Sequence, residues 1–257
     1  MMNYIKSECY RVVHTKTFYI VMAVLSGLVL LMNTVNSISG HFIPDFRYDT
    51  FRFSLNSFTS FIMLMLAMGA VVSSLLFIDD RKNGALEQAV SYGISREKIF
   101  IGKCITAFGF SLVILLEVLI VYVGSAFILL RNPEWQPLKE MLLGIAAALP
   151  SAAGSLIFTL TLGSLYKKET PIILWWSVVF CTIPMVLALI GLQVEAVAEI
   201  ASWMPYNYFN REVRVTYSDY QCLWDTTAGM AKCLISGGIG MGVFTVFGWW
   251  KLRRQEF

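Results

Sequence analysis

Few side chains in this sequence have a type and spacing that could carry out chemistry. The sequence has two histidines and no H-E-x-x-H motif, so it lacks the pattern of a zinc hydrolase. The closest match to a phosphate-binding loop is Gly102-Lys103-Cys104. Glu97 stands where that loop needs its first glycine, and a cysteine replaces the magnesium-binding hydroxyl. We therefore expect no enzyme activity and no catalytic, cofactor-binding or metal-binding residue in the chain.

One acidic residue, Glu117, lies in the middle of a long apolar run, residues 104–130. A charged side chain at the centre of a bilayer costs about 2.5–3.5 kcal/mol, so the carboxyl must be neutral, be paired or face a wet interior. A hydrogen bond to a neighbouring helix, for example to Thr159, Thr161 or Thr182, would satisfy it. Alternatively, it lines a substrate path or lies in a dimer interface. A proton relay is the weakest alternative, because a relay needs more than one such residue.

The elements that position these residues have to be membrane-spanning helices. The chain is 57% hydrophobic and 14% charged, with a mean hydropathy of +0.65, whereas soluble chains carry about 25% charged residues. About 20 apolar residues cross the hydrocarbon core as a helix. We predict an all-α polytopic membrane protein with one domain over residues 1–257. Its six spans are expected at about 17–38, 58–78, 104–130, 141–165, 171–192 and 231–250.

The charged residues between the spans predict the orientation of the chain. Lys and Arg number 13 in the segments on one side and 7 on the other, and the richer side is expected to face the cytoplasm. Both termini belong to that richer side. No basic patch suggests a nucleic-acid partner, and the apolar composition makes the lipid bilayer the expected surroundings. The five cysteines are scattered, and a pairing of Cys222 with Cys233 is left open.

The cytoplasmic segment between spans two and three, residues 79–98, is patterned as a short amphipathic helix. Leu86 and Ala89 share one face of it, Gly93 is placed to end it, and Ser95 is placed to cap the next helix. Such a helix could lie on lipid headgroups or dock into a partner protein. Its small apolar face and mixed charge favour a protein partner.

At the level of motif, this segment resembles the membrane subunit of ABC-2 type transporters. That family combines six spans and cytoplasmic termini with an acidic-Gly-x-Leu-Glu helix ahead of a Ser-Arg pair that opens span three. In this sequence the matching residues are Asp80, Gly84, Leu86, Glu87, Ser95 and Arg96. The family commonly has Thr after the glycine and Pro ahead of Ser-Arg, whereas Ala85 and Gly93-Ile94 stand here.

The resemblance implies a coupling helix that sits in a cleft of a separate ATPase subunit. Its residues would be Gly84, Ala85, Leu86, Glu87, Ala89, Val90, Ser95 and Arg96. The chain itself would bind no cofactor, because ATP and magnesium would be held by two ATPase subunits. A second permease subunit, identical or paralogous, would complete the transporter.

The outer segment after span five has apolar residues at helical spacing up to Met204, and Pro205 is expected to stop that helix. It reads as an interfacial helix followed by an aromatic belt. The ABC-2 resemblance implies a re-entrant segment that caps the outer end of the pathway. The residues of this outer gate or interface are Trp203, Met204, Tyr206 and Tyr208. In span six, Gly238 and Gly242 form a G-x-x-x-G motif, which predicts close helix packing.

The resemblance implies a permease subunit of an ATP-binding-cassette exporter. It would move a peptide or another hydrophobic or amphipathic substrate out of the cell or membrane. Among family members, the chain is most similar to the short permeases of bacterial peptide-antibiotic export or immunity, which handle bacteriocins and lantibiotics. The alternative is a secondary, ion-coupled transporter or channel that uses Glu117.

Overall fold

The computed structural model describes residues 2–68, 71–72, 89, 91–166, 168–210, 214–215 and 220–253. Within these ranges, five helices are long and apolar enough to cross a membrane. They match predicted spans one, three, four, five and six, which confirms a largely helical, multi-pass membrane protein. They are α2 (Lys16–Phe42), α6 (Arg96–Leu129), α7 (Trp135–Leu165), the continuous helix Glu169–Ile190 and α12 (Thr227–Arg253).

The second predicted span, 58–78, lies only in part within the described residues. The helix there, α3 (Phe51–Ser60), starts earlier than predicted because the Thr50 side chain accepts a hydrogen bond from a backbone N–H of its first turn. α3 ends at a turn at residues 61–62, and residues 63–68 are helical again. The uninterrupted apolar helix predicted there is therefore broken by this turn, and the count of six spans stays a prediction.

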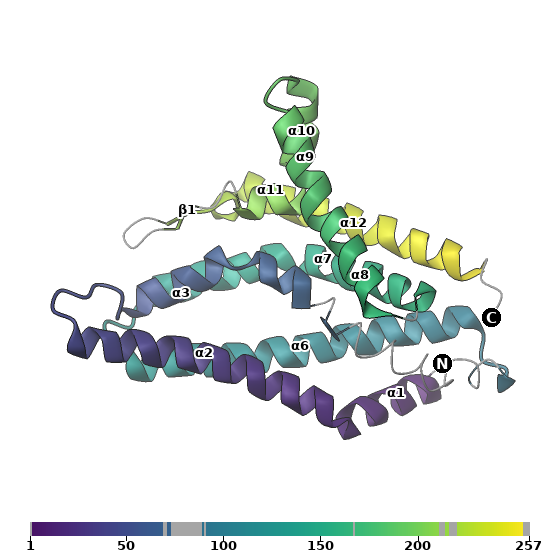
Figure 1. Ribbon diagram of the computed structural model, residues 1–257, viewed down its shortest axis with the longest axis horizontal. Coiled ribbons are helices and arrows are strands. Elements are labelled where there is room, and N and C mark those ends of the chain that lie inside the picture. The colour runs from purple at the N-terminus through teal and green to yellow at the C-terminus, as the bar shows by residue number, and fades with distance from the viewer. Residues whose placement is uncertain are drawn as a thin grey trace.

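The helices are arranged around α7. α2 and α6 lie side by side, α3 and α7 form a second layer beside them, and α12 packs along α7 (Figure 1). In the most apolar window of α7, 61% of the residues are buried, against 22% in α6, so α7 is the more enclosed helix. The two ends of the chain lie toward the same end of the molecule (Figure 1). The side of the membrane that this end faces stays a prediction.

The N-terminal helix α1 (Met2–His14) was not predicted from the sequence, because its charged residues conceal it among the non-spanning segments. It joins α2 after a break at Thr15 and lies against the start of α6. Figure 1 shows α1 turned away from the direction of α2. α1 therefore runs beside the base of the spans as a separate element.

The fifth span leans away from the other helices (Figure 1). It is built from α8 (Glu169–Ser177), a π-helical turn η1 (Val178–Thr182) and α9 (Ile183–Ile190). The helix predicted after it is confirmed as α10 (Glu195–Ser202), and Pro205 opens the next helix, α11 (Pro205–Asn210). α10 folds back closely on α9, since a Cβ on Gly191 would lie 2.7 Å from Ala198 Cα.

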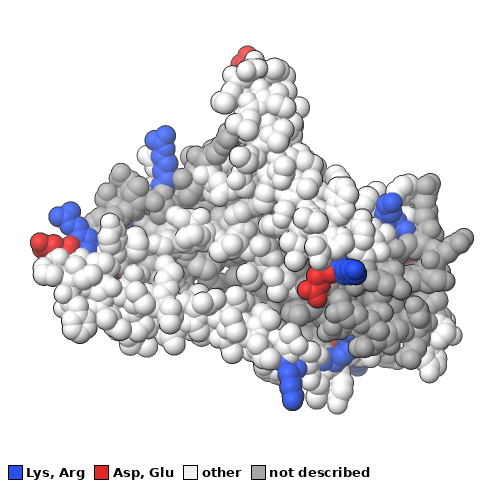
Figure 2. All heavy atoms as spheres, in the orientation of Figure 1, with Lys and Arg blue, Asp and Glu red and all other residues white. Residues whose placement is uncertain are grey.

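Short elements lie at the end of the molecule opposite the chain termini. A two-stranded antiparallel hairpin pairs β1 (Arg214–Val215) with β2 (Tyr220–Gln221), and the 3₁₀ turn η2 (Leu223–Asp225) leads into α12. Arg131 Nε lies 3.0 Å from Asp49 Oδ2 and ties the α2–α3 connection to the end of α6. Figure 2 shows charged side chains at this end, whereas the surface over the middle of α2 is uncharged. This distribution suits a molecule whose middle faces lipid.

The contact between α12 and α7 corrects the interpretation of the glycine motif. A Cβ on Gly238 or Gly242 would meet nothing within 4 Å. A Cβ on Gly237 would instead lie 2.7 Å from Pro150 Cβ, and one on Gly154 would lie 3.2 Å from the Met241 backbone nitrogen. Close packing is thus present, but it runs through Gly237 of α12 and Gly154 of α7. The cysteines Cys222 and Cys233 are both free thiols.

Candidate functional site

The predicted coupling helix lies largely outside the described residues. Gly84, Ala85, Leu86, Glu87 and Val90 are not described, whereas Ala89, Ser95 and the backbone of Arg96 are. Where the description resumes, the helix ends as the sequence predicted. Gly93 has a φ of +79°, and the Ile94 N–H donates to the Ala89 carbonyl, which is the bond of a Schellman motif. Ser95 then occupies the N-cap position of α6.

This helix end packs against the base of α6. Ala89 and Ile94 contact a hydrophobic cluster that includes Ile99 and Phe100 of α6 and Val12 of α1. Because Ile94 and Ser95 alone connect the glycine turn to α6, the segment has little freedom to move independently of that span. The geometry therefore joins three elements at one end of the molecule: the end of the predicted coupling helix, α1 and α6.

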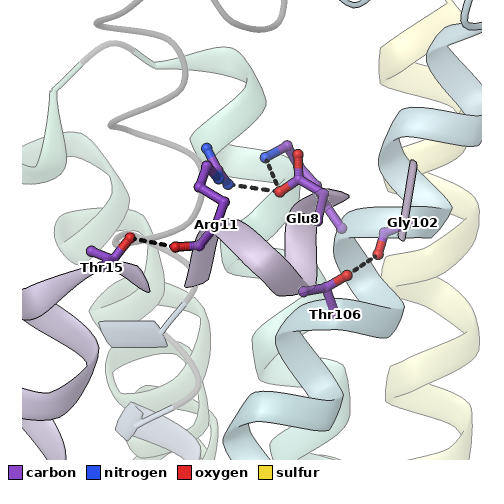
Figure 3. A network of polar contacts seen from close by, with 6 residues as sticks. Glu8, Arg11, Thr15, Gly102 and Thr106 are labelled. Carbon is purple, nitrogen blue, oxygen red and sulfur yellow. Dashed lines mark hydrogen bonds and ion pairs between the residues drawn. The ribbon is translucent and has the colours of Figure 1, made fainter. Parts of the chain in front are cut away.

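A buried ionic cluster holds α1 on α6. Lys103 Nζ lies 3.3 Å from Glu8 Oε2, and Arg11 Nη2 lies 2.6 Å from the same oxygen. Figure 3 shows Glu8 and Arg11 on α1 facing the part of α6 that carries Gly102 and Thr106. A Cβ on Gly102 would lie 2.7 Å from the Tyr4 ring, so this glycine lets α1 approach the α6 backbone. From the sequence, Lys103 was placed at the base of span three and in a failed match to a phosphate loop, but its pairing with Glu8 was not predicted.

Burial decides how much this cluster contributes. Lys103 is 1% exposed and Glu8 is 8% exposed, whereas the Arg11 side chain is 36% exposed. An ion pair between exposed side chains is worth about 0–1 kcal/mol, but removing one partner of a buried pair costs about 3–5 kcal/mol. The ion pair of Glu8 with Lys103 therefore contributes more to stability than the ion pair of Glu8 with Arg11. Burial, and next the Glu8 carboxylate, raise the pKa of the Tyr4 phenol, so this ring stays neutral beside the carboxylate.

Glu117 finds its partner on α2. The Ser26 hydroxyl donates to Glu117 Oε1 at 2.5 Å, while Oε2 is buried with no hydrogen-bond partner among the described residues. The partners suggested from the sequence bond instead within their own helices: Thr159 to the Ser155 carbonyl, Thr161 to Ile157 and Thr182 to Ser177. α2 lies beside α6, so a residue of the first span reaches Glu117 before any threonine of α7 can.

We expect Glu117→Gln to leave the stability of the protein within about 0.5 kcal/mol of wild type, because the amide oxygen can still accept from Ser26. Ser26→Ala should cost about 1 kcal/mol, the usual range for one interhelical hydrogen bond in a membrane. Denaturant unfolding in detergent measures both. Ser57→Ala is the control, since Ser57 donates to the Phe53 carbonyl of its own helix. A Glu117→Gln protein less stable than the Ser57→Ala control by about 1 kcal/mol or more would contradict this expectation, and a stable Glu117→Gln protein that has lost transport would give the charge a role.

A second buried polar network lies nearer the far end of the same helices. The Asn33 amide nitrogen donates to Ser125 Oγ at 2.8 Å and to the Tyr122 carbonyl at 3.0 Å. The Ser54 hydroxyl donates to Asn33 Oδ1 at 2.6 Å, and the Tyr122 hydroxyl donates to the Ser54 carbonyl. The network joins α2, α3 and α6. Because its members satisfy one another, it fixes the packing of these helices.

The four residues predicted for the outer gate do not share one environment. Tyr208 is 0% exposed, and its hydroxyl lies 3.1 Å from Ser151 Oγ of α7, so it belongs to the core. Trp203 is at the surface, where Lys232 Nζ lies 5.8 Å from the ring centroid and the Ser236 hydroxyl donates to the Trp203 carbonyl. Met204 and Tyr206 are half-buried. The structure thus brings α11 onto α7 and the end of α10 onto α12.

The long apolar helices, the uncharged middle surface and the packed helix ends define a multi-pass membrane protein. The family model described as ABC-2 family transporter protein matches residues 4–181, which is well over half of the 257 residues. The chain therefore belongs to the ABC-2 family of transporters. Permeases of this family are the membrane components of transporters, are not themselves catalytic and typically work with ABC ATPase partners. No curated protein sequence matches the chain.

Proposed function

We propose that the chain is the permease subunit of an ATP-driven exporter in a bacterial plasma membrane. It would move a peptide or another amphipathic substrate out of the cell or membrane, in the manner of peptide-antibiotic export or immunity permeases. Two separate ATPase subunits supply the hydrolysis of ATP, and a second permease subunit, identical or paralogous, completes the pathway. Membership of the ABC-2 family supports the role of a membrane component of a transporter, and to this role we add the partner subunits and the substrate class.

The observation that carries the proposal is the packing at the start of α6. Ala89 and Ile94, which end the predicted coupling helix, contact the same hydrophobic cluster as Val12 of α1 and Phe100 of α6. Coupling between distant sites travels through packed side chains and rigid elements. A push on the coupling helix by an ATPase is therefore delivered to α6 and α1 together. α6 carries Glu117, whose carboxylate accepts a hydrogen bond from Ser26 of α2, so the movement also reaches the first span.

The alternative, an ion-coupled transporter or channel that uses Glu117, has less support. The one described hydrogen-bond partner of Glu117 is the neutral Ser26 hydroxyl. Proton relays in membranes use chains of ionisable residues, which a serine does not extend.

The proposal is tested by co-expressing the tagged permease with ABC ATPases and measuring the ATPase recovered with it in detergent. We expect the wild type to capture an ATPase. Leu86→Arg and Glu87→Arg should each lower capture about tenfold or more, because a disrupted central contact in an interface costs about 2 kcal/mol. ATP-dependent loss of a labelled amphipathic peptide from cells provides the functional reading.

Glu195→Arg is the matched control, because it makes the same charge reversal on α10, at the far side of the predicted membrane. It should capture ATPase as the wild type does. A well-folded wild type that captures no ATPase, or equal capture by Glu87→Arg and Glu195→Arg, would count against the proposal. A flux that depends on a proton gradient and not on ATP would favour the ion-coupled alternative.

A further inference from the structure

An apolar cleft of about 360 Å³ lies among α2, α6, α7 and residues 58–68 and 71–72. On α2 its lining runs from Val21 to Met32, on α6 from Phe108 to Tyr122, and on α7 from Leu149 to Leu156. α2, α6 and α7 are all long and apolar enough to cross a membrane. The cleft therefore lies within the stretch of the molecule that crosses the membrane.

The shape of the cleft limits what can occupy it. Its lining on α6 covers 14 residue steps, which at 1.5 Å per residue gives a length of about 21 Å. The 360 Å³ is the space open to the centre of a water-sized sphere, so over this length it corresponds to a tube about 5 Å across, or about 7–8 Å between the lining atoms once a radius of about 1.4 Å is added on each side. A helix with its side chains is about 10–12 Å across. The cleft is long and narrow, and it is too narrow for a helical peptide.

The chemistry of the lining limits the occupant further. All lining side chains are hydrocarbon or thioether except those of Ser111 and Tyr122, and the Tyr122 hydroxyl is already bonded to Ser54. An extended peptide brings an N–H and a carbonyl at every residue, and these need partners when they are removed from water. The cleft offers one such group, Ser111 Oγ, which has no hydrogen-bond partner among the described residues, so it cannot provide a partner at every residue of a peptide. Methionines at positions 32, 65 and 68 provide side chains that adapt to an irregular apolar surface.

The cleft opens toward lipid. Several residues that line it are also among the exposed apolar residues of the outer surface, including Leu28 at 59%, Phe61 at 59% and Leu64 at 55%. The surface over the middle of α2 carries no charged side chain (Figure 2). A hydrocarbon chain in the surrounding bilayer can therefore enter from the side without passing a polar barrier.

We propose that this cleft binds one hydrocarbon chain of a membrane lipid, held lengthwise between α2, α6 and α7. The bound chain fills the space between the two helix layers and becomes part of their packing. The site is formed by this chain alone, so the proposal does not depend on the ATPase. Loss of lipid binding and loss of ATPase capture are therefore separate outcomes.

The test counts the lipids retained by the permease after purification in a mild detergent and extensive washing, by mass spectrometry of the extracted lipid per chain. The wild type should retain about one lipid per chain, as expected of a single site. Ala152→Phe places a ring in the cleft and should retain about tenfold less, since displacing two methylenes is worth about that factor. Ala23→Phe is the control, because Ala23 is exposed on α2 outside the cleft.

A second variant, Leu112→Phe, adds less volume to the cleft than Ala152→Phe does, so it serves if Ala152→Phe does not fold. It should retain about fourfold less lipid than wild type, since the larger side chain displaces about one methylene of the bound hydrocarbon chain. A wild type that retains no lipid overturns the proposal, as does equal retention by the cleft variants and Ala23→Phe. A peptide found in the cleft in place of a lipid overturns it as well.

Discussion

Glu8→Ala is expected to lower the free energy of unfolding by about 3 kcal/mol or more. The substitution removes the carboxylate bonded to Lys103, whose ammonium group is 1% exposed and cannot turn to water without separating α1 from α6. Denaturant unfolding in detergent measures the loss. The departure of α1 can be followed by limited proteolysis at its junction with α2.

Two controls separate burial from simple charge. Arg11→Ala also removes an ion pair to Glu8, but its side chain is 36% exposed, so it should cost less than about 1 kcal/mol. The double replacement Glu8→Met with Lys103→Met should regain most of the stability, because a well-packed apolar pair often substitutes for a buried ion pair. A Glu8→Ala protein no less stable than Arg11→Ala would refute the assignment.

Gly237→Ala is expected to destabilise the contact of α12 with α7 by about 2–3 kcal/mol. Its Cβ would lie 2.7 Å from both Pro150 Cβ and the Ser151 backbone nitrogen, and a backbone atom of a packed helix cannot move aside. α12 must then withdraw from α7. The measurements are denaturant unfolding and the fraction of protein recovered as a monodisperse species.

Gly238→Ala, one position further along, supplies the matched control. Its Cβ meets nothing within 4 Å, and alanine is the better helix former by about 1 kcal/mol, so stability should stay equal or rise. Alanine should lower the stability at Gly237 and leave it equal or raise it at Gly238, so the two neighbouring substitutions test the contact directly. If both glycines tolerate alanine equally, the contact does not run through Gly237.

The spans were predictable from the sequence because a helix needs a minimum length to cross the hydrocarbon core of a bilayer. About 20 apolar residues are needed to cross it, and five of the predicted runs coincide with described helices. The helix end at Gly93 was also predictable, since a glycine in that position has a local backbone reason. Along the second predicted span, the turn at residues 61–62 was missed, because its residues are as apolar as a helix interior.

The polar contacts were not predictable, because they depend on which helices become neighbours. Glu117 was recognised as a residue in need of a partner, but Ser26 lies 91 positions away and nothing local indicates that α2 is the nearest helix. The glycine spacing in span six predicted close packing, yet not that Gly237 faces α7. Neighbouring positions on a helix differ by about 100° in direction, and only the docked helix decides which of them is at the contact.

The ion pair between α1 and α6 also has a consequence for the order of events during synthesis. Glu8 and Lys103 are 95 positions apart in the chain. At about 5–20 residues per second, the carboxylate is made roughly 5–19 seconds before its ammonium partner leaves the ribosome. During that interval α1 has to remain hydrated at the surface of the membrane. Its polar residues, which concealed it in the sequence, keep the nascent segment out of the bilayer until α6 arrives.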